Sequence, residues 1–333
     1  FLNVIFVNLL FSDSFKLHLL FTNNIHGAIH EVPARFINPE FSPILAGGAG
    51  AFTYASKIRK EAKLKEDFVM LTDAGNIFQG SQLGTYDGGS NIIKWMNWMA
   101  YDAIVPGVRD FDQGVNNLSK LASEANFPFL ASNLEGVDGI EDYKIIDANG
   151  VRIGLIGLIT PFISEGLLPE YYEGVAVSDI KKTLSTQIEK IRSDVDLIFV
   201  LSHLGIPYDR EDEYDDFIKD IEQGVERPIR NAIELAHFTD EVDVIITGGV
   251  SKGYDTPWID PTNHTIVLQN YGNLTGIGHL VLHIDNQNKV IENYSFPTER
   301  GMMVNLFTDD IWPDKVIQDS IKNWIDAVSY THL

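Results

Sequence analysis

Short apolar segments alternate with amphipathic segments along most of the chain, and this alternation constrains the fold more than any other feature. The alternating segments are the predicted strands 17–21, 68–71, 103–105, 128–131 and 196–201 and the predicted helices 47–63, 91–99, 115–125 and 180–192. Strands that are separated by helices favour parallel pairing in an α/β architecture. Apolar segments from residue 242 onward follow one another with little helix between them, which indicates a mixed sheet.

One tight turn and one long helix are specific local predictions. Segments 143–146 and 151–158 form a predicted hairpin, because Asn149-Gly150 between them is a pair that two-residue turns prefer. Residues 212–237 are predicted to form one long acidic helix. Its charged run is interpreted as a solvated face, with a partner-docking surface as the alternative.

The composition excludes several classes of protein. Hydrophobic residues make up 44% of the 333 residues, which is enough to bury a large core and excludes a disordered chain. The formal net charge is −22, whereas nucleic acid is bound by clustered Lys and Arg, so no nucleic-acid partner is expected. The chain has no cysteine, which excludes disulfides, thiolate zinc sites and cysteine nucleophiles.

Both ends of the chain carry segments that we exclude from fold reasoning. Residues 1–14 combine an apolar run with small residues before Phe15, which is typical of the remnant of an export signal; a buried strand is the alternative. The run is shorter than the ~20 residues that span a membrane, and no later segment is apolar enough to do so. We therefore predict an exported protein, periplasmic or extracellular. Residues 328–333 resemble a sequencing or cloning scar.

Five segments with polar side chains follow predicted strands, where α/β proteins bind their ligands. They are 22–27 (TNNIHG), 73–81 (DAGNIFQGS), 107–112 (GVRDFD), 202–205 (SHLG) and 248–252 (GGVSK). Their order and spacing resemble the bacterial 5′-nucleotidase and UDP-sugar hydrolase family of calcineurin-like metallophosphoesterases. The resemblance extends over nearly the whole chain, from about residue 17 to residue 307.

The resemblance implies an α/β fold of four layers, α-β-β-α, built on two mixed sheets. It also implies a phosphoric ester hydrolase in which two divalent metal ions share a bridging carboxylate and a bound hydroxide attacks phosphorus. It divides the chain into a metallophosphoesterase-like domain, 15–310, and the start of a linking helix, 311–327. In this family a C-terminal nucleotidase domain supplies the nucleoside pocket, so we expect one in the full-length protein.

The sequence departs from this family at the residues that bind metal. Of seven ligand positions, His26 and His203 are kept. The remaining ligand positions carry Asn24, Asn76, Val108, Val250 and Lys252. Arg109 stands at the position of the catalytic His, and the acidic neighbour of that His is kept as Asp110. A gap of one residue in the last motif would shift the pairing of Val250 and Lys252.

Charge limits what such a site can hold. Two divalent ions bring four positive charges, yet the family's aspartates are replaced by the amides of Asn24 and Asn76. Arg109 and Lys252 add two cations, and an Arg does not lose its proton in a protein. Two His are also fewer than the three protein ligands usual for a catalytic zinc. We therefore expect metal to bind weakly or not at all, and the two amides to hold their loops by hydrogen bonds to the backbone.

The leading functional hypothesis is a catalytically degenerate 5′-nucleotidase-like domain, derived from an enzyme of nucleotide catabolism. Its predicted ligand is a phosphate or a nucleotide, bound without hydrolysis. The candidate anion-binding residues are Arg109, Lys252, His26 and His203. An active metal-dependent phosphomonoesterase with an altered site and a non-catalytic scaffold are the alternatives, so the sequence leaves enzymatic activity open. The two His are alternatively structural residues inherited from an enzyme.

Overall fold

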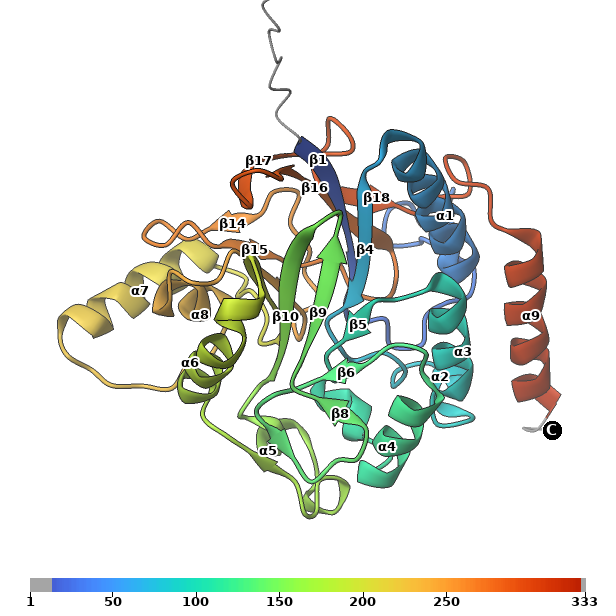
Figure 1. Cartoon of the computed structure of the whole chain (residues 1–333). Helices are drawn as coiled ribbons and strands as arrows, with labels where there is room; N and C mark the ends of the chain where they lie inside the picture. Colours follow the sequence, from blue (N-terminus) through green and yellow to red (C-terminus); the bar gives the residue numbers. More distant parts are fainter. Residues whose placement is uncertain (1–13, 331–333) are drawn as a thin grey trace, which may run out of the picture.

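A computed structural model describes residues 14–330, which form two β-sheets packed face to face with helices outside both (Figure 1). Residues 1–13 and 331–333 lie outside the described residues, and they include most of the predicted export signal and half of the predicted scar. Within residues 14–330, every helix is too short or too polar to cross a bilayer.

The first sheet has eight strands, in the order β17-β16-β1-β4-β5-β6-β8, with β18 paired to β16. Its strands are β1 (Ser14–Thr22), β4 (Phe68–Asp73), β5 (Ala103–Ile104), β6 (Phe129–Leu130), β8 (Ile140–Glu141), β16 (Gly276–Asp285), β17 (Val290–Ser295) and β18 (Met303–Asn305). Strand β1 pairs parallel with β4 and antiparallel with β16, so the sheet is mixed as predicted.

The second sheet has six strands, in the order β14-β15-β13-β12-β10-β9. They are β9 (Tyr143–Ala148), β10 (Val151–Ile159), β12 (Leu197–His203), β13 (Val244–Thr247), β14 (Trp258–Ile259) and β15 (Ile266–Leu268). Strands β9 and β10 form the predicted hairpin, and Asn149 and Gly150 have φ of 54° and 88°. Positive φ at both central residues is the requirement of a type I′ turn, which explains the Asn-Gly pair.

Helices cover the outer face of each sheet. Those over the first sheet are α1 (Gly47–Lys65), α2 (Gln82–Thr85), α3 (Ser90–Met99), α4 (Val115–Glu124) and α9 (Lys315–Tyr330). Those over the second sheet are α6 (Ile180–Ile191), α7 (Arg210–Glu222) and α8 (Ala232–Phe238). The shorter elements are α5 (Ile163–Gly166), the 3₁₀ turns η1 (Val108–Phe111), η2 (Pro169–Tyr171) and η3 (Arg192–Asp194), and the strand pairs β2 (Val32–Pro33) with β3 (Ile44–Leu45) and β7 (Leu134–Glu135) with β11 (Ala176–Val177).

Three apolar cores separate these layers and confirm the predicted four-layer sandwich of two mixed sheets. The central core lies between the sheets, and Phe199 and Leu201 of β12 point into it. Their neighbours Ile198 and Val200 point to the opposite face and pack under α6, α7 and α8. A third core lies between the first sheet and its own helices. Because strand side chains alternate between faces, a strand that is apolar throughout is suited to an inner layer with both faces covered.

The acidic segment 212–237 forms two helices, so the prediction of a single helix is wrong. Helix α7 ends at Glu222, and the chain turns at Gly224, whose φ of 72° favours glycine. Pro228 then lacks the backbone N–H that an uninterrupted helix needs. The predicted solvated face is present, since Tyr214 and Phe217 are the buried residues of α7.

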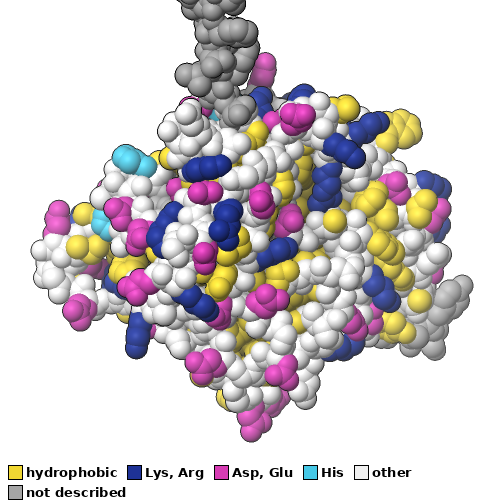
Figure 2. All heavy atoms as spheres, viewed as in Figure 1, with side chains coloured by type: hydrophobic (Ala, Val, Ile, Leu, Met, Phe, Trp, Pro, Cys, Tyr) yellow, Lys and Arg dark blue, Asp and Glu magenta, His cyan; other side chains and the backbone are white. Residues whose placement is uncertain are grey.

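Helix α9 begins four residues after the start of the segment predicted as a linking helix, 311–327, and extends three residues beyond its end. It begins at Lys315 and includes Val328, the first residue of the predicted scar, which is buried. On the face of the molecule in Figure 2, acidic and basic side chains are interspersed. The net charge of −22 is therefore not gathered into one patch on that face.

Candidate functional site

The loops that carry the five sequence motifs meet at one edge of the sandwich. In the first sheet they follow the carboxyl ends of β1, β4 and β5, and in the second sheet those of β12 and β13. Backbone hydrogen bonds join the first two loops, from Asn24 N to Gly75 O (2.8 Å) and from His26 N to Asn76 O (2.9 Å). Loops that are far apart in the sequence therefore approach one another, as in the hydrogen bond between Gly249 and Asn24, which are 225 positions apart.

Left-handed backbone conformations gather in these two loops. The φ angles are 50° at Asn24, 53° at His26 and 61° at Asn76. Such angles are uncommon outside glycine, although Asn and His adopt them more readily than most residues. Clusters of such strained residues occur at ligand sites, where the surrounding structure holds them in place.

The side-chain amides of Asn24 and Asn76 hold neighbouring loops together by hydrogen bonds to the backbone, as predicted. The side chain of Asn24 accepts a hydrogen bond from Gly249 N (3.0 Å) and donates one to Ser251 Oγ (3.0 Å). The side-chain oxygen of Asn76 accepts one from Arg109 N (2.8 Å). The amides thus connect the first motif to the last and the second motif to the third.

The two retained histidines are neutral and similarly oriented. His203 is buried and His26 is half-buried, and in each the Nδ1 atom contacts a backbone carbonyl, that of Ala74 and that of Gln79 (2.8 Å for Gln79). Burial lowers the pKa of His203 to about 4 and also lowers the pKa of His26. Because a carbonyl only accepts, Nδ1 carries the proton and Nε2 is left as a lone-pair acceptor.

The Arg109 guanidinium faces the same opening as His26. Its Nη1 lies 3.6 Å from an oxygen of Asp112 and 3.4 Å from the carbonyl of Gly166. About half of the Arg109 side chain is exposed, so it is accessible to a ligand. Arg109 lowers the pKa of His26 and Asp112 raises it, in addition to the larger effect of burial, which indicates that the three groups are close. Asp112 belongs to the third sequence motif, 107–112, but it was not among the predicted site residues.

Asp110 is a structural tie between two of the loops. Its buried carboxylate accepts hydrogen bonds from the backbone N–H groups of Gly107, Asn76 and Ile77, each at 2.8 Å. Burial raises its pKa to about 6. The carboxylate is thereby directed at the backbone of its own turn and of the loop after β4.

The structure does not bring Lys252 together with the other predicted anion-binding residues. Its Nζ donates to the carbonyl of Tyr208 (2.9 Å) and lies over the rings of Tyr208 and Tyr254, 5.2 and 4.9 Å from their centroids. Cation–aromatic contacts of this kind hold the ammonium group in place. The side chain of Val250 lies against Gly205, and that of Val108 lies against Gly166, so the two valines fill space at the site.

The residues present do not fit two divalent ions. Within residues 14–330, no three His, Cys, Asp or Glu side chains are placed to hold one metal. The nearby carboxylate of Asp73 is bound by the Thr22 hydroxyl (2.6 Å) and Gly75 N (2.8 Å), and that of Asp110 by backbone. The site therefore lacks the free negative charge that a pair of divalent ions needs.

The chain is similar in sequence to curated 5′-nucleotidases. It is 26% identical to the 5′-nucleotidase of Rattus norvegicus over 330 residues, covering 94% of this chain and 53% of that protein. The chain thus spans about half the length of the curated relatives it matches first. No family model matches the sequence.

Solved structures share the fold. The calcineurin-like phosphoesterase YfkN of Bacillus subtilis superposes with a TM-score of 0.70 at 21% identity, covering 96% of this chain and all of that one. A 5′-nucleotidase precursor of Thermus thermophilus gives a TM-score of 0.70 at 20% identity, covering 95% of this chain and 59% of that one. Identities this low show the fold alone.

Proposed function

We propose, since the chain belongs to the 5′-nucleotidase family of calcineurin-like metallophosphoesterases, that its site binds a phosphate or nucleotide without hydrolysing it. The observation that supports this proposal is the reversal of charge at the site. Asn24 and Asn76 are neutral and are engaged with backbone, whereas Arg109 places a cation at the opening. Metal-dependent attack on phosphorus is thus lost while attraction for the anion is kept.

Arg109 is the residue that carries anion binding in this proposal. The guanidinium offers several N–H donors in a planar fork that matches two phosphate oxygens. Its own contacts, to Asp112 and to the Gly166 carbonyl, are long at 3.6 and 3.4 Å, so a phosphate can displace them. At neutral pH His26 and His203 are uncharged and add shape more than charge.

Thermal stability in the absence of metal tests this function. Purified protein is treated with a chelator, dialysed, and heated with adenosine 5′-monophosphate at ten times the dissociation constant. We expect a stabilisation of about 1.4 kcal/mol, which raises the Tm of a domain this size by about 2 °C. The variant Arg109→Ala should lose the rise and Lys252→Ala should keep it. An unchanged Tm with millimolar nucleotide would contradict the proposal and leave a non-catalytic scaffold.

One observation favours the alternative of an active phosphomonoesterase with an altered site. His26 and His203 both donate Nδ1–H to a backbone carbonyl, and metal-bound histidines are commonly oriented in this way. Such an enzyme would retain stoichiometric metal after purification, whereas the non-hydrolysing protein would not. Export to the periplasm or the cell exterior, and a C-terminal nucleotidase domain in the full-length protein, remain part of the proposal.

A further inference from the structure

A second pocket adjoins the candidate site on the side of the last motif. It has a volume of about 340 Å³, and we call it the side pocket. The residues that line it include Phe36, Ile37, Tyr271, Ser251, Asn273 and Asn305. Pockets that bind small molecules are similarly lined by apolar and aromatic side chains with a few polar groups between them.

The apolar part of the side pocket is open to water. Phe36 is 73% exposed, Ile37 53% and Tyr271 42%. Single exposed hydrophobic residues are ordinary, but three that line one hollow form an apolar patch, which is typical of a binding surface. Two of the three, Phe36 and Tyr271, are aromatic, and an aromatic face stacks well on another planar ring.

The polar part of the side pocket has unused hydrogen-bonding capacity. The side-chain amides of Asn273 and Asn305 are exposed and have no hydrogen-bond partner among residues 14–330. An amide presents a donor and an acceptor side by side. That pattern is complementary to the edge of a nucleobase, as in the paired hydrogen bonds between Asn and adenine.

The side pocket shares a wall with the candidate site. Asn24 donates from its side chain to Ser251 Oγ (3.0 Å), and its carbonyl accepts a hydrogen bond from Asn273 N (2.8 Å). Gly272 N in turn donates to the Ser251 carbonyl (3.2 Å). Asn24 lies two positions before His26 in the same loop. Asn24 therefore connects the wall of the side pocket to the loop that carries His26.

We propose that the side pocket binds the planar base of a nucleoside monophosphate whose phosphate lies at Arg109. The inference rests on the proposed function, because it assumes that the site holds an anion. It adds that this domain contributes its own base-binding surface. The ring stacks against Phe36 and Tyr271, and the amides of Asn273 and Asn305 bind its edge.

Three probes separate the two parts of the ligand. The chelated 333-residue chain is titrated calorimetrically with adenosine 5′-monophosphate, with ribose 5-phosphate, which lacks the base, and with adenosine, which lacks the phosphate. Stacking on one aromatic residue is worth about tenfold or more in affinity. We therefore expect adenosine 5′-monophosphate to bind at least about tenfold more tightly than ribose 5-phosphate.

Variants on one loop supply a matched control. Phe36→Ala should abolish the advantage of adenosine 5′-monophosphate over ribose 5-phosphate. Phe41→Ala should keep it, because Phe41 is 81% exposed on the same loop and does not line the side pocket. Both phenylalanines are mostly exposed, so neither substitution should impair folding.

The outcomes distinguish failure of the side pocket from failure of the proposed function. Equal binding of the two phosphates, unaffected by Phe36→Ala, would overturn the side pocket and leave anion binding intact. Loss of both phosphates in Arg109→Ala supports anion binding. If neither phosphate binds the unaltered protein, the proposed function fails. In that case, binding of adenosine that depends on Phe36 would still support base binding in the side pocket. If adenosine does not bind either, both the side pocket and the proposed function are overturned.

Discussion

A single buried carboxylate holds two loops of the candidate site together. Asp110 lies in the turn η1 and accepts hydrogen bonds from three backbone N–H groups, two of which belong to the loop after β4. Hydrogen bonds to a charged acceptor are stronger than those to a neutral one. Burial opposes this gain, since it raises the pKa of Asp110 to about 6. Since the pKa is raised overall, the three hydrogen bonds offset only part of the cost of burying the charged carboxylate.

Removing the Asp110 carboxylate should therefore destabilise the whole domain. Asp110→Ala leaves three buried N–H groups without acceptors, and we expect the free energy of unfolding to fall by about 3 kcal/mol or more. Urea denaturation followed by circular dichroism measures it. Asp112→Ala is the matched control, because its carboxylate contacts Arg109 at 3.6 Å near the surface. Equal stabilities for the two variants would refute the structural role of Asp110.

The positions of the site residues could be predicted from the sequence, but the directions of their side chains could not. Polar residues at the carboxyl ends of parallel strands converge whatever else the chain contains, so Asn24, Asn76 and His203 come together as expected. Lys252 lies in the right loop, yet it turns toward Tyr208 and Tyr254. That direction depends on a contact with the segment before α7, which no local pattern reveals.

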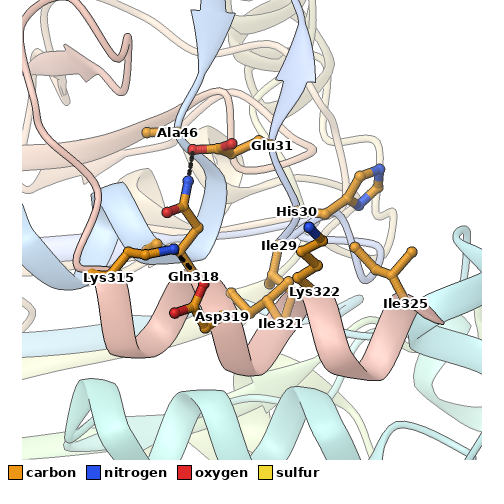
Figure 3. Close-up of a pocket in the computed structure, with 11 residues that line it drawn as sticks. Ile29, His30, Glu31, Ala46, Lys315, Gln318, Asp319, Ile321, Lys322 and Ile325 are labelled. Carbon is orange, nitrogen blue, oxygen red and sulfur yellow. Dashed lines mark hydrogen bonds and ion pairs between the residues drawn. The ribbon is translucent and has the colours of Figure 1, made fainter. Parts of the chain in front are cut away.

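At the scale of elements, helix α9 is attached to the domain through one apolar face. Ile317 and Ile321 are buried, and the ring of Trp324 stacks on Trp98 at 5.2 Å between centroids. Figure 3 shows α9 over a cavity of about 310 Å³, with Gln318 directed at Glu31, to which it donates a hydrogen bond of 2.7 Å.

A charge on the buried face of α9 should release this helix and leave the sandwich folded. Ile321→Asp places a carboxylate in the apolar contact, so we expect residues 315–330 to become sensitive to protease and their amide protons to exchange faster. Val316→Asp is the control, since Val316 is 73% exposed on the opposite face. If Ile321→Asp unfolds the sandwich as well, α9 is an integral layer of the core.

Long periodic elements were predictable, and short or interrupted ones were not. The hydrophobic periodicity of α1, α3, α4 and α6 is local, so the predicted bounds lie within two residues of the observed ones. Two-residue strands such as β2, β3 and β14 are too short to show a periodicity, and they are defined only by their pairing with another strand. The break between α7 and α8 was missed because acidic composition outweighed the signal of Gly224 and Pro228.

Across the whole molecule, a chain of buried and partly buried polar side chains links helix α1, strands β16 and β1, and the turn before β4. The Tyr54 hydroxyl of α1 contacts His279 Nδ1 on β16 (2.8 Å), and His279 Nε2 contacts His18 Nδ1 on β1 (3.0 Å). His18 Nε2 lies 3.6 Å from Asp67, just before β4. With both histidines neutral, every group donates to the next: tyrosine to His279, His279 to His18, and His18 to the carboxylate.

This chain of polar side chains should make the free energy of unfolding fall as the pH is lowered. Burial lowers the pKa of His279 to about 3, whereas the unfolded chain has the ordinary value of 6.5. Below pH 6.5 the unfolded state therefore binds a proton that the folded state does not, and stability decreases until the pH reaches the folded pKa. Between pH 7 and pH 5 this one group should lower the free energy of unfolding by about 2 kcal/mol.

Other buried groups act in the opposite direction, so the test compares a variant with the unaltered protein. Burial raises the pKa of Asp73 to about 7 and that of Asp110 to about 6. Each of these carboxyl groups therefore increases the free energy of unfolding of the protein as the pH falls. In the variant His279→Asn the contributions of the two carboxyl groups remain, and the contribution of His279 to the pH dependence is removed. Urea denaturation at pH 7 and pH 5 should show the stability of the unaltered protein falling by about 2 kcal/mol relative to His279→Asn. His264 is exposed, so His264→Asn is the control and should give no such difference. If the stabilities of His279→Asn and the unaltered protein depend on pH in the same way, the chain of polar side chains is not held neutral.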